Sequence, residues 1–367
     1  MQLPYSDELN INYLARLFDN KSECYKYFWF KAILTKLEEG RLSFVFEELV
    51  NEMVADAWYM VLECRLNLGP KDNLATLIKH ISETTGMKPS EKKAVILDYL
   101  EHNRDRKVMR LKMILIGNVP YRLQSPFMPE LKSKDFEGRI EERIARINHH
   151  KRIMYYFGLY EGLNTTIHMQ KDWALYLQKN MDIIKGWLQY KLIIYLQKRN
   201  PSVPGISDKL YPPQERKLEK VREYWRLIME LRPIREIYGH TELTAENISI
   251  DHFVPWSYVA HDELWNLHPT TRDINSRKSN RLPDWQTYFP LLCEQEYLSY
   301  SMIWQYEKVL KKFNECAKVH LNNEDIRYRL YRKGLNRNQF ESQLCEIILP
   351  IYNSAKNCGF DNWVYDN

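Results

Sequence analysis

The chain has 367 residues, of which 44% are hydrophobic and 28% charged, with a formal net charge of +5. This composition is typical of a globular protein of two or three modules. The N-terminus shows no signal-peptide pattern, and the apolar runs are far shorter than the roughly 20 residues that cross a bilayer. Six scattered cysteines without a C-x-x-C pair argue against a zinc ribbon or a disulfide scaffold. We therefore expect a cytoplasmic protein without membrane association.

The N-terminal region reads as mainly helical. Apolar residues at helical spacing, with glycines as stop signals, predict helices over residues 22–40, 43–69, 73–86 and 90–103. Residues 107–131 are irregular and contain prolines, so they are predicted to form short extended pieces and loops. Further helices are expected at 135–152 and 169–198, with a short strand and turn between them.

Positive charge is concentrated in one segment. Residues 101–152 hold thirteen Lys and Arg against seven Asp and Glu, an excess of six positive charges that accounts for the whole net charge. Such a segment can lie along a nucleic-acid backbone, because each neutralised phosphate releases counterions. Solvated helix faces give the same statistics, so both interpretations stay open.

The second half of the chain changes character twice. Residues 199–213 contain four prolines and a glycine and form the best linker candidate, followed by a predicted helix at 215–231. Residues 234–255 have a hairpin-like pattern, and helical spacing returns after residue 286. The fold class is thus predicted as mainly α with a small α+β insert. We expect a helical substrate-binding or regulatory region over 1–232, a finger over 233–286 and a C-terminal helical region over 287–367.

The insert contains a distinctive arrangement of polar residues. In "IDHFVPWSYVAHDELWNLHPTTRDINSRKSNRLP", residues 250–283, Asn266 follows His252 by fourteen positions and Asn275 follows it by twenty-three. Together with Asp251 and the nearby Lys278, this pattern resembles the HNH endonucleases, also called His-Me finger or ββα-metal nucleases. The resemblance covers about residues 235–285 and is similar to the HNH domain of Cas9-type and bacterial restriction or defence nucleases.

The chemistry of these residue types fits phosphodiester hydrolysis. A histidine is the natural base near neutral pH, and carboxylate and amide oxygens suit a hard divalent cation. A short helix over residues 270–280, capped by Thr270 or Thr271, places Asn275, Lys278 and Ser279 on one face. Adjacent residues of a strand point to opposite faces, so Asp251 and His252 can serve one site only if the strand twists or ends there.

The resemblance implies a role for each residue. Asp251 and Asn275 would hold Mg²⁺ or Mn²⁺, and His252 would be the general base. Asn266 would pin the loop and orient the histidine, while Lys278 and Arg277 would contact phosphate. Two further histidines lie off the pattern, and we interpret His261 as a solvated loop residue and His268 as a packing residue. The zinc-binding cysteines of many relatives are missing, so apolar packing must brace this finger.

We therefore predict a metal-dependent endonuclease that hydrolyses DNA phosphodiester bonds, with RNA as an alternative substrate. By analogy, such a chain acts in bacterial restriction or phage defence. Two alternatives stay open. The first is a nucleic-acid-binding or scaffold protein with an idle finger. The second is a nuclease that works only with an activating protein partner or as a homodimer.

Overall fold

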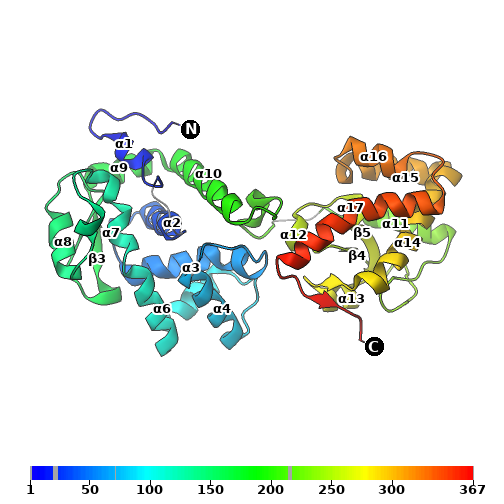
Figure 1. Cartoon of the computed structure of the whole chain (residues 1–367), viewed down its shortest axis with the longest axis horizontal. Helices are drawn as coiled ribbons and strands as arrows, with labels where there is room; N and C mark the ends of the chain where they lie inside the picture. Colours follow the sequence, from blue (N-terminus) through cyan, green and yellow to red (C-terminus); the bar gives the residue numbers. More distant parts are fainter. Residues whose placement is uncertain (1, 20–23, 71, 214–216, 367) are drawn as a thin grey trace. The chain divides into compact units, whose positions relative to one another are not determined.

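The computed structural model describes residues 2–19, 24–70, 72–213 and 217–366 (Figure 1). It is mainly helical with small sheets, as the sequence predicted. The chain divides into two compact units, a first unit of residues 1–201 with 210–212 and a second unit of residues 202–209 with 213–367. The division falls within the proline-rich segment 199–213. Both boundaries expected from the sequence, at 232–233 and 286–287, lie inside the second unit.

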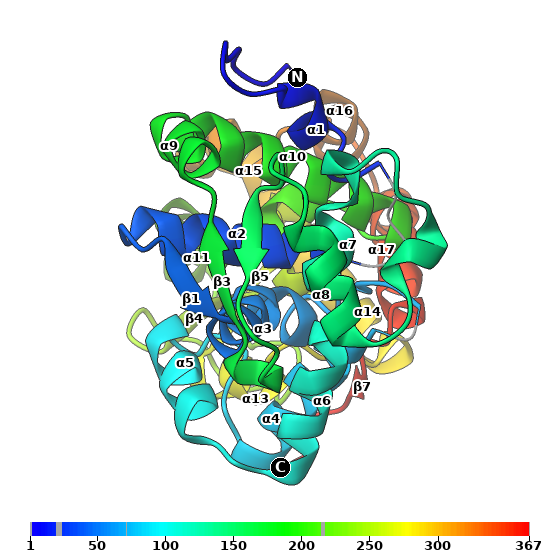
Figure 2. The ribbon, with the colours of Figure 1, turned by 90° about the vertical axis from the view of Figure 1, so that its left-hand side faces the viewer.

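The first unit contains ten helices and three strands among its described residues. They are α1 (Ile11–Ala15), α2 (Tyr25–Glu38), β1 (Ser43–Val45), α3 (Phe46–Leu62), α4 (Asn73–Thr85), α5 (Lys93–His102), α6 (Arg106–Ile116), α7 (Val119–Leu123), α8 (Ile140–Asn148), β2 (Tyr155–Phe157), β3 (Thr166–Met169), α9 (Lys171–Lys179) and α10 (Met181–Arg199). The strands form an antiparallel sheet in the order β1-β3-β2, and Figure 2 labels β1 and β3. Phe46, the first residue of α3, packs on Trp29, Tyr121 and Phe157 in the core.

Two predictions for the first unit are wrong. Residues 107–131 were expected to be extended but are mostly helical, because Asp105 caps α6 and Pro120 lies in the first turn of α7, where no backbone N–H is needed. Residues 43–45 form β1 rather than helix, since they pair with β3 more than 120 positions away. The helix predicted from residue 22 begins at Tyr25, and Ser22 itself lies outside the described residues.

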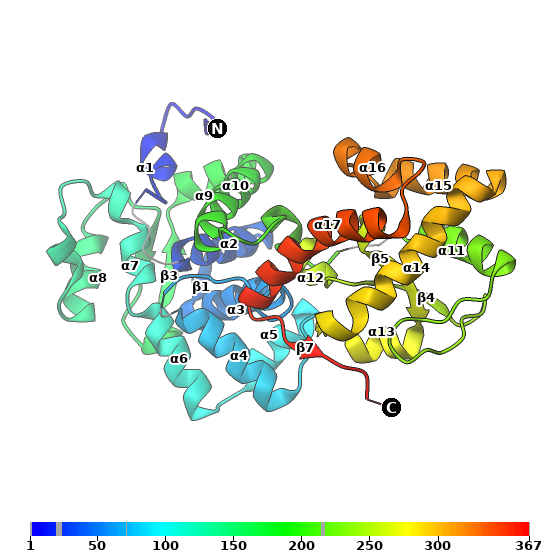
Figure 3. The same ribbon diagram turned by 45° about the vertical axis from the view of Figure 1, so that its right-hand side comes forward.

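The second unit surrounds a two-stranded sheet with helices. Its described elements are α11 (Glu219–Leu231), β4 (Ile248–His252), α12 (Trp256–Val259), β5 (Leu267–Thr271), α13 (Arg272–Lys278), β6 (Leu282–Pro283), α14 (Trp285–Gln305), α15 (Glu307–His320), α16 (Glu324–Tyr331), α17 (Arg337–Asn357) and β7 (Asn362–Trp363). Figure 3 shows α14 and α17, which pack against each other. No helix among the described residues is long and apolar enough to cross a membrane.

One aromatic side chain joins the sheet to these helices. Phe253, directly after β4, is fully buried and contacts Trp285 and Phe289 of α14 and Tyr352 of α17. Trp285 and Phe289 stack on each other with ring centroids 4.0 Å apart. This burial of apolar area fixes the end of β4 against the helical layer.

Candidate active site

The candidate site is built on β4, β5 and α13. The strands are antiparallel, and their register places Asp251 opposite His268 and His252 opposite Leu267. Helix α13 follows β5 directly, and Thr271 caps it by accepting a hydrogen bond from the backbone N–H of Ile274 at 3.4 Å. The helix therefore returns along β4, so side chains one turn apart on α13 meet the strand.

Asp251 is buried among hydrogen-bond donors. Its Oδ2 accepts a bond from the Tyr238 hydroxyl at 3.1 Å and lies 3.0 Å from Nζ of Lys278 and 3.5 Å from Nε2 of His268. Burial by itself raises the pKa of this carboxyl, but the cationic Lys278 and the His268 bond outweigh burial and hold the pKa well below its usual range. Asp251 is thus a carboxylate at neutral pH and can serve as an oxygen ligand.

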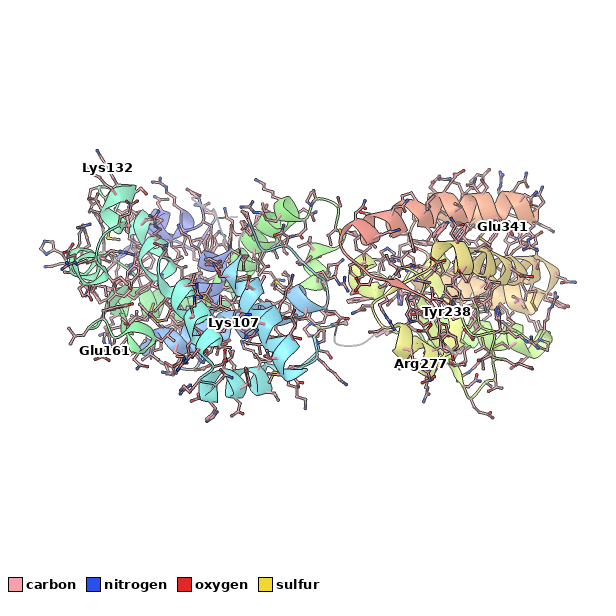
Figure 4. All side chains as sticks on the ribbon, turned by 60° about the horizontal axis from the view of Figure 1, so that its bottom comes forward. Lys107, Lys132, Glu161, Tyr238, Arg277 and Glu341 are labelled. Atoms are coloured by element: carbon pink, nitrogen blue, oxygen red, sulfur yellow. The ribbon has the colours of Figure 1, made fainter. Side chains whose placement is uncertain are left out.

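Lys278 is the cation nearest to this carboxylate. Its side chain is fully buried, and Nζ bonds Asp251 Oδ1 at 3.2 Å and the carbonyl oxygen of His252 at 2.8 Å. Burial lowers the pKa of Lys278, while Asp251 acts against that change. In this arrangement the ammonium neutralises the predicted metal ligand and fixes the end of β4. Arg277, by contrast, is exposed (Figure 4), and its Nε lies 3.0 Å from Oδ2 of Asp273.

His252 ends β4 and has a different set of partners from Asp251. Its Nε2 lies 2.8 Å from Oδ1 of Asp262, and its side chain is 5% exposed. The two adjacent side chains therefore contact separate groups, as alternation along a strand requires. Lys278 links the two residues, because it contacts the carboxylate of Asp251 and the backbone carbonyl of His252.

Asn266 fixes the chain just beyond His252. This fully buried residue accepts a bond from the Val254 N–H at 2.8 Å through Oδ1, and its Nδ2 donates to the Val254 carbonyl at 2.9 Å. Its own carbonyl accepts a bond from Phe253 N–H. The side-chain amide of Asn266 thus satisfies the backbone of Val254, which lies beyond the end of β4 and, among the described residues, has no strand partner there. It thereby holds the turn that follows His252.

Asn275 is the second predicted metal ligand. Its Nδ2 donates to Ser249 Oγ at 3.0 Å and to the Ile250 carbonyl at 3.1 Å, which orients the amide toward β4. Within the described residues, Oδ1 of Asn275 has no hydrogen-bond partner. Asp251 and Asn275 together offer the two kinds of oxygen that Mg²⁺ or Mn²⁺ accepts. No group of three or more His, Cys, Asp or Glu in the described part of the chain could hold a metal, so water and substrate phosphate would complete the shell.

Three residues of the site were not predicted as site residues from the sequence, and one of them, His268, was interpreted as a packing residue. Tyr238 and His268 both contact Asp251, and the Tyr238 hydroxyl lies 3.0 Å from His268 Nε2. Asp262 contacts His252, ten positions earlier in the chain. In the sequence, these three residues stand out only as polar residues inside an otherwise apolar segment. His261 is only partly exposed, and its Nδ1 is buried, so its interpretation as a solvated residue is wrong.

Comparison with protein families agrees with this geometry. Residues 236–284 match the model of a family described as HNH endonuclease. This segment, which carries β4, β5 and α13, is therefore similar to the HNH endonucleases. Comparisons with curated proteins and with solved structures found no match. A family of this kind implies nuclease activity on nucleic acid, generally with a divalent metal.

Proposed function

We propose that this protein is a metal-dependent endonuclease that hydrolyses DNA, with β4, β5 and α13 as its ββα-metal finger and with a role in restriction or phage defence. The observation that carries the proposal is the grouping of Asp251, His252 and Asn275 around β4 within a segment that matches the HNH family. The order of these residues and the buried clamp made by Asn266 both support a working site rather than a remnant.

In the proposed mechanism His252 takes a proton from the attacking water, which typically contributes about 10²–10⁴-fold to a rate. Asp251 and Asn275 would hold the Mg²⁺ or Mn²⁺, which would supply Lewis-acid stabilisation of the scissile phosphate. Asn266 keeps the histidine in place through the backbone of Val254. Lys278 balances the charge of Asp251, and Arg277 is exposed on α13 for contact with phosphate.

We propose that the basic segment of the first unit binds the nucleic-acid backbone. On α6 the side chains of Arg106, Lys107 and Arg110 are exposed, and none of the three has an acidic partner among the described residues. Figure 4 labels Lys107 on this helix. Two other cations of the segment are paired with carboxylates, Lys112 with Glu47 and Arg152 with Glu130. The face of α6 therefore carries three cations that are available to phosphates.

The test is cleavage of supercoiled plasmid by the full chain with Mg²⁺ or Mn²⁺. Wild-type protein should nick the plasmid, and both a chelator and the His252→Ala substitution should reduce nicking by at least 10²-fold. Exposed His240, outside the proposed site, provides the control, because His240→Ala should cut as wild type does. Equal cutting by wild type and His252→Ala would refute the proposal.

One observation favours a second candidate, a nuclease activated by a partner. Asp251 and His252 are 5% and 4% exposed, so a substrate has little access to either side chain in this conformation. A protein that cuts only after a partner or a longer substrate is added would support this candidate. Steeply salt-dependent DNA binding without cutting under any metal or partner would instead indicate an idle finger.

A further inference from the structure

The most specific contact that the proposed mechanism leaves unexplained is the one between Asp262 and His252. We propose that Asp262 is a positioning residue that sets the tautomer of His252 and supports the charge that this histidine gains during the reaction. The inference rests on the proposed function, because it assigns a partner to the proposed general base. Its basis is the 2.8 Å distance between Asp262 Oδ1 and His252 Nε2, with the histidine almost completely buried.

The tautomer follows from the chemistry of the two groups. An ionised carboxylate can only accept hydrogen bonds, so Nε2 of His252 must carry the proton in this contact. In the neutral imidazole the lone pair is then on Nδ1, and this nitrogen is the one that can take a proton from water. Once it has done so, the ring is cationic, and the adjacent carboxylate stabilises it through a charge-assisted bond.

The chain conformation explains why Asp262 reaches the histidine. Helix α12 ends at Val259, and the next residue, Ala260, has a left-handed φ of 55°, which turns the chain back toward the end of β4. Residues 261–263 therefore pass beside His252 before the chain enters β5 through the short 3₁₀ helix of Leu264–Asn266. A positive φ is uncommon for a residue other than glycine, which indicates that tertiary contacts hold this turn.

Those contacts come from the C-terminal helices. His320, the last residue of α15, is 2% exposed, and its Nδ1 donates to the carbonyl oxygen of Asp262 at 2.9 Å. The neighbouring Glu263 is also buried, and its carboxylate accepts bonds from both the backbone N–H and Nδ2 of Asn322, at distances from 2.7 to 3.3 Å. His320 and Asn322, at the junction of α15 and α16, thus hold the backbone carbonyl of Asp262 and the side chain of Glu263.

This arrangement gives the C-terminal helices a specific task. The HNH match ends at residue 284, whereas the clamp on Asp262 comes from residues 320 and 322. The orientation of the general base therefore depends on a part of the second unit outside the matched segment. A change at the α15–α16 junction should reach the active site through Asp262 without any contact between the junction and the substrate.

The first experiment compares Asp262→Asn and Asp262→Ala with wild type in plasmid nicking at saturating metal. Asparagine preserves the shape but allows the wrong tautomer and supports no imidazolium charge. We expect both substitutions to lower kcat at least tenfold while KM for DNA changes by less than about twofold. Asp208→Asn, an exposed acid in the same unit, is the matched control and should retain wild-type kcat. A purely structural role predicts instead that Asp262→Asn cuts like wild type, and that outcome would overturn the inference.

A second measurement separates this inference from the proposed function. Two-dimensional ¹H–¹⁵N spectra of the histidine rings, with the His252 signals assigned by His252→Ala, report which ring nitrogen carries the proton. Wild type should show His252 protonated on Nε2, and Asp262→Ala should shift the signals toward a mixture of tautomers. If the wild-type protein never cuts DNA, the proposed function fails whatever the spectra show. If the His252 signals are identical in both proteins, the positioning role fails even when cutting is observed.

Discussion

Nζ of Lys278 lies 3.0 Å from Oδ2 of Asp251, and both side chains are almost completely removed from solvent. The strand β4 supplies the carboxylate and the following helix α13 supplies the ammonium, 27 positions later in the chain. Removal of one charge of such a buried pair is strongly destabilising, because the remaining charge has lost its hydration without compensation. The pair therefore couples the folding of the finger to the charge of its predicted metal ligand.

The first prediction concerns this pair. Lys278→Met should lower the free energy of unfolding by about 3–5 kcal/mol, since it leaves the Asp251 carboxylate without its cation. The double variant Asp251→Asn/Lys278→Met removes both charges and should be more stable than Lys278→Met alone. Denaturant titration of wild type, Lys278→Met and the double variant measures these differences. A single variant as stable as wild type would show that the ammonium does not balance Asp251.

The second prediction concerns the Asn266 clamp. Asn266→Ala removes the partners of both the N–H and the carbonyl of Val254, two buried backbone groups that each cost about 1–3 kcal/mol when left unsatisfied. We expect a loss of about 2–4 kcal/mol in the free energy of unfolding. Asn357→Ala, at the exposed end of α17, should change it by less than about 0.5 kcal/mol. Equal stability of the two variants would contradict the role of the clamp.

The third prediction concerns the face of α6. Replacing Arg106, Lys107 and Arg110 by alanine should weaken DNA binding and reduce the slope of log K against log salt by about 2–3, since each phosphate contact contributes about 0.9. The charge-matched control replaces the exposed Lys308, Lys311 and Lys318 of α15 by alanine. Fluorescence anisotropy with a labelled duplex at several salt concentrations measures both slopes. The same reduction in both triple variants would indicate a net-charge effect and no specific surface on α6.

The fourth prediction concerns the pH dependence of stability at His261. Burial, with a smaller contribution from His252, lowers the pKa of His261 to about 4 in the folded chain. The unfolded chain, with an ordinary histidine pKa of about 6.5, therefore binds more protons between pH 6.5 and 4, and stability falls as the pH drops through this window. Allowing for partial exposure, we expect His261→Gln to remove about 1–2 kcal/mol of this loss. The free energy of unfolding of both proteins is measured from pH 7 to pH 4. A difference between the two proteins that stays constant over this range would contradict the assignment.

The sequence by itself indicated the family of the central segment, because the pattern that identifies it is local. The spacing of Asp251, His252, Asn266 and Asn275 identified the HNH segment, which the family comparison confirms. Thr271 was one of the two residues predicted to cap this helix, and its hydroxyl does accept a capping hydrogen bond at the start of α13. Capping and helix periodicity depend on neighbours within a few residues, and these are visible in the sequence.

What the sequence could not provide depends on contacts between distant segments. Residues 43–45 became a strand through pairing with β3, and the proline-containing segment after residue 105 became helical around a cap and a tolerated Pro120. At the site, the contacts of Tyr238 and His268 with Asp251 join residues 13 and 17 positions away from it in opposite directions.

The full burial of Lys278 and the clamp on Asp262 are the clearest cases of tertiary control. A lysine beside a predicted phosphate site reads as a surface cation, and only the packing of α13 on β4 turns its ammonium toward Asp251 and the His252 carbonyl. Likewise, nothing in the residues around 262 indicates His320 or Asn322 as partners. The sequence specifies which groups can react, whereas long-range packing decides which of them are buried, paired and held in a reactive orientation.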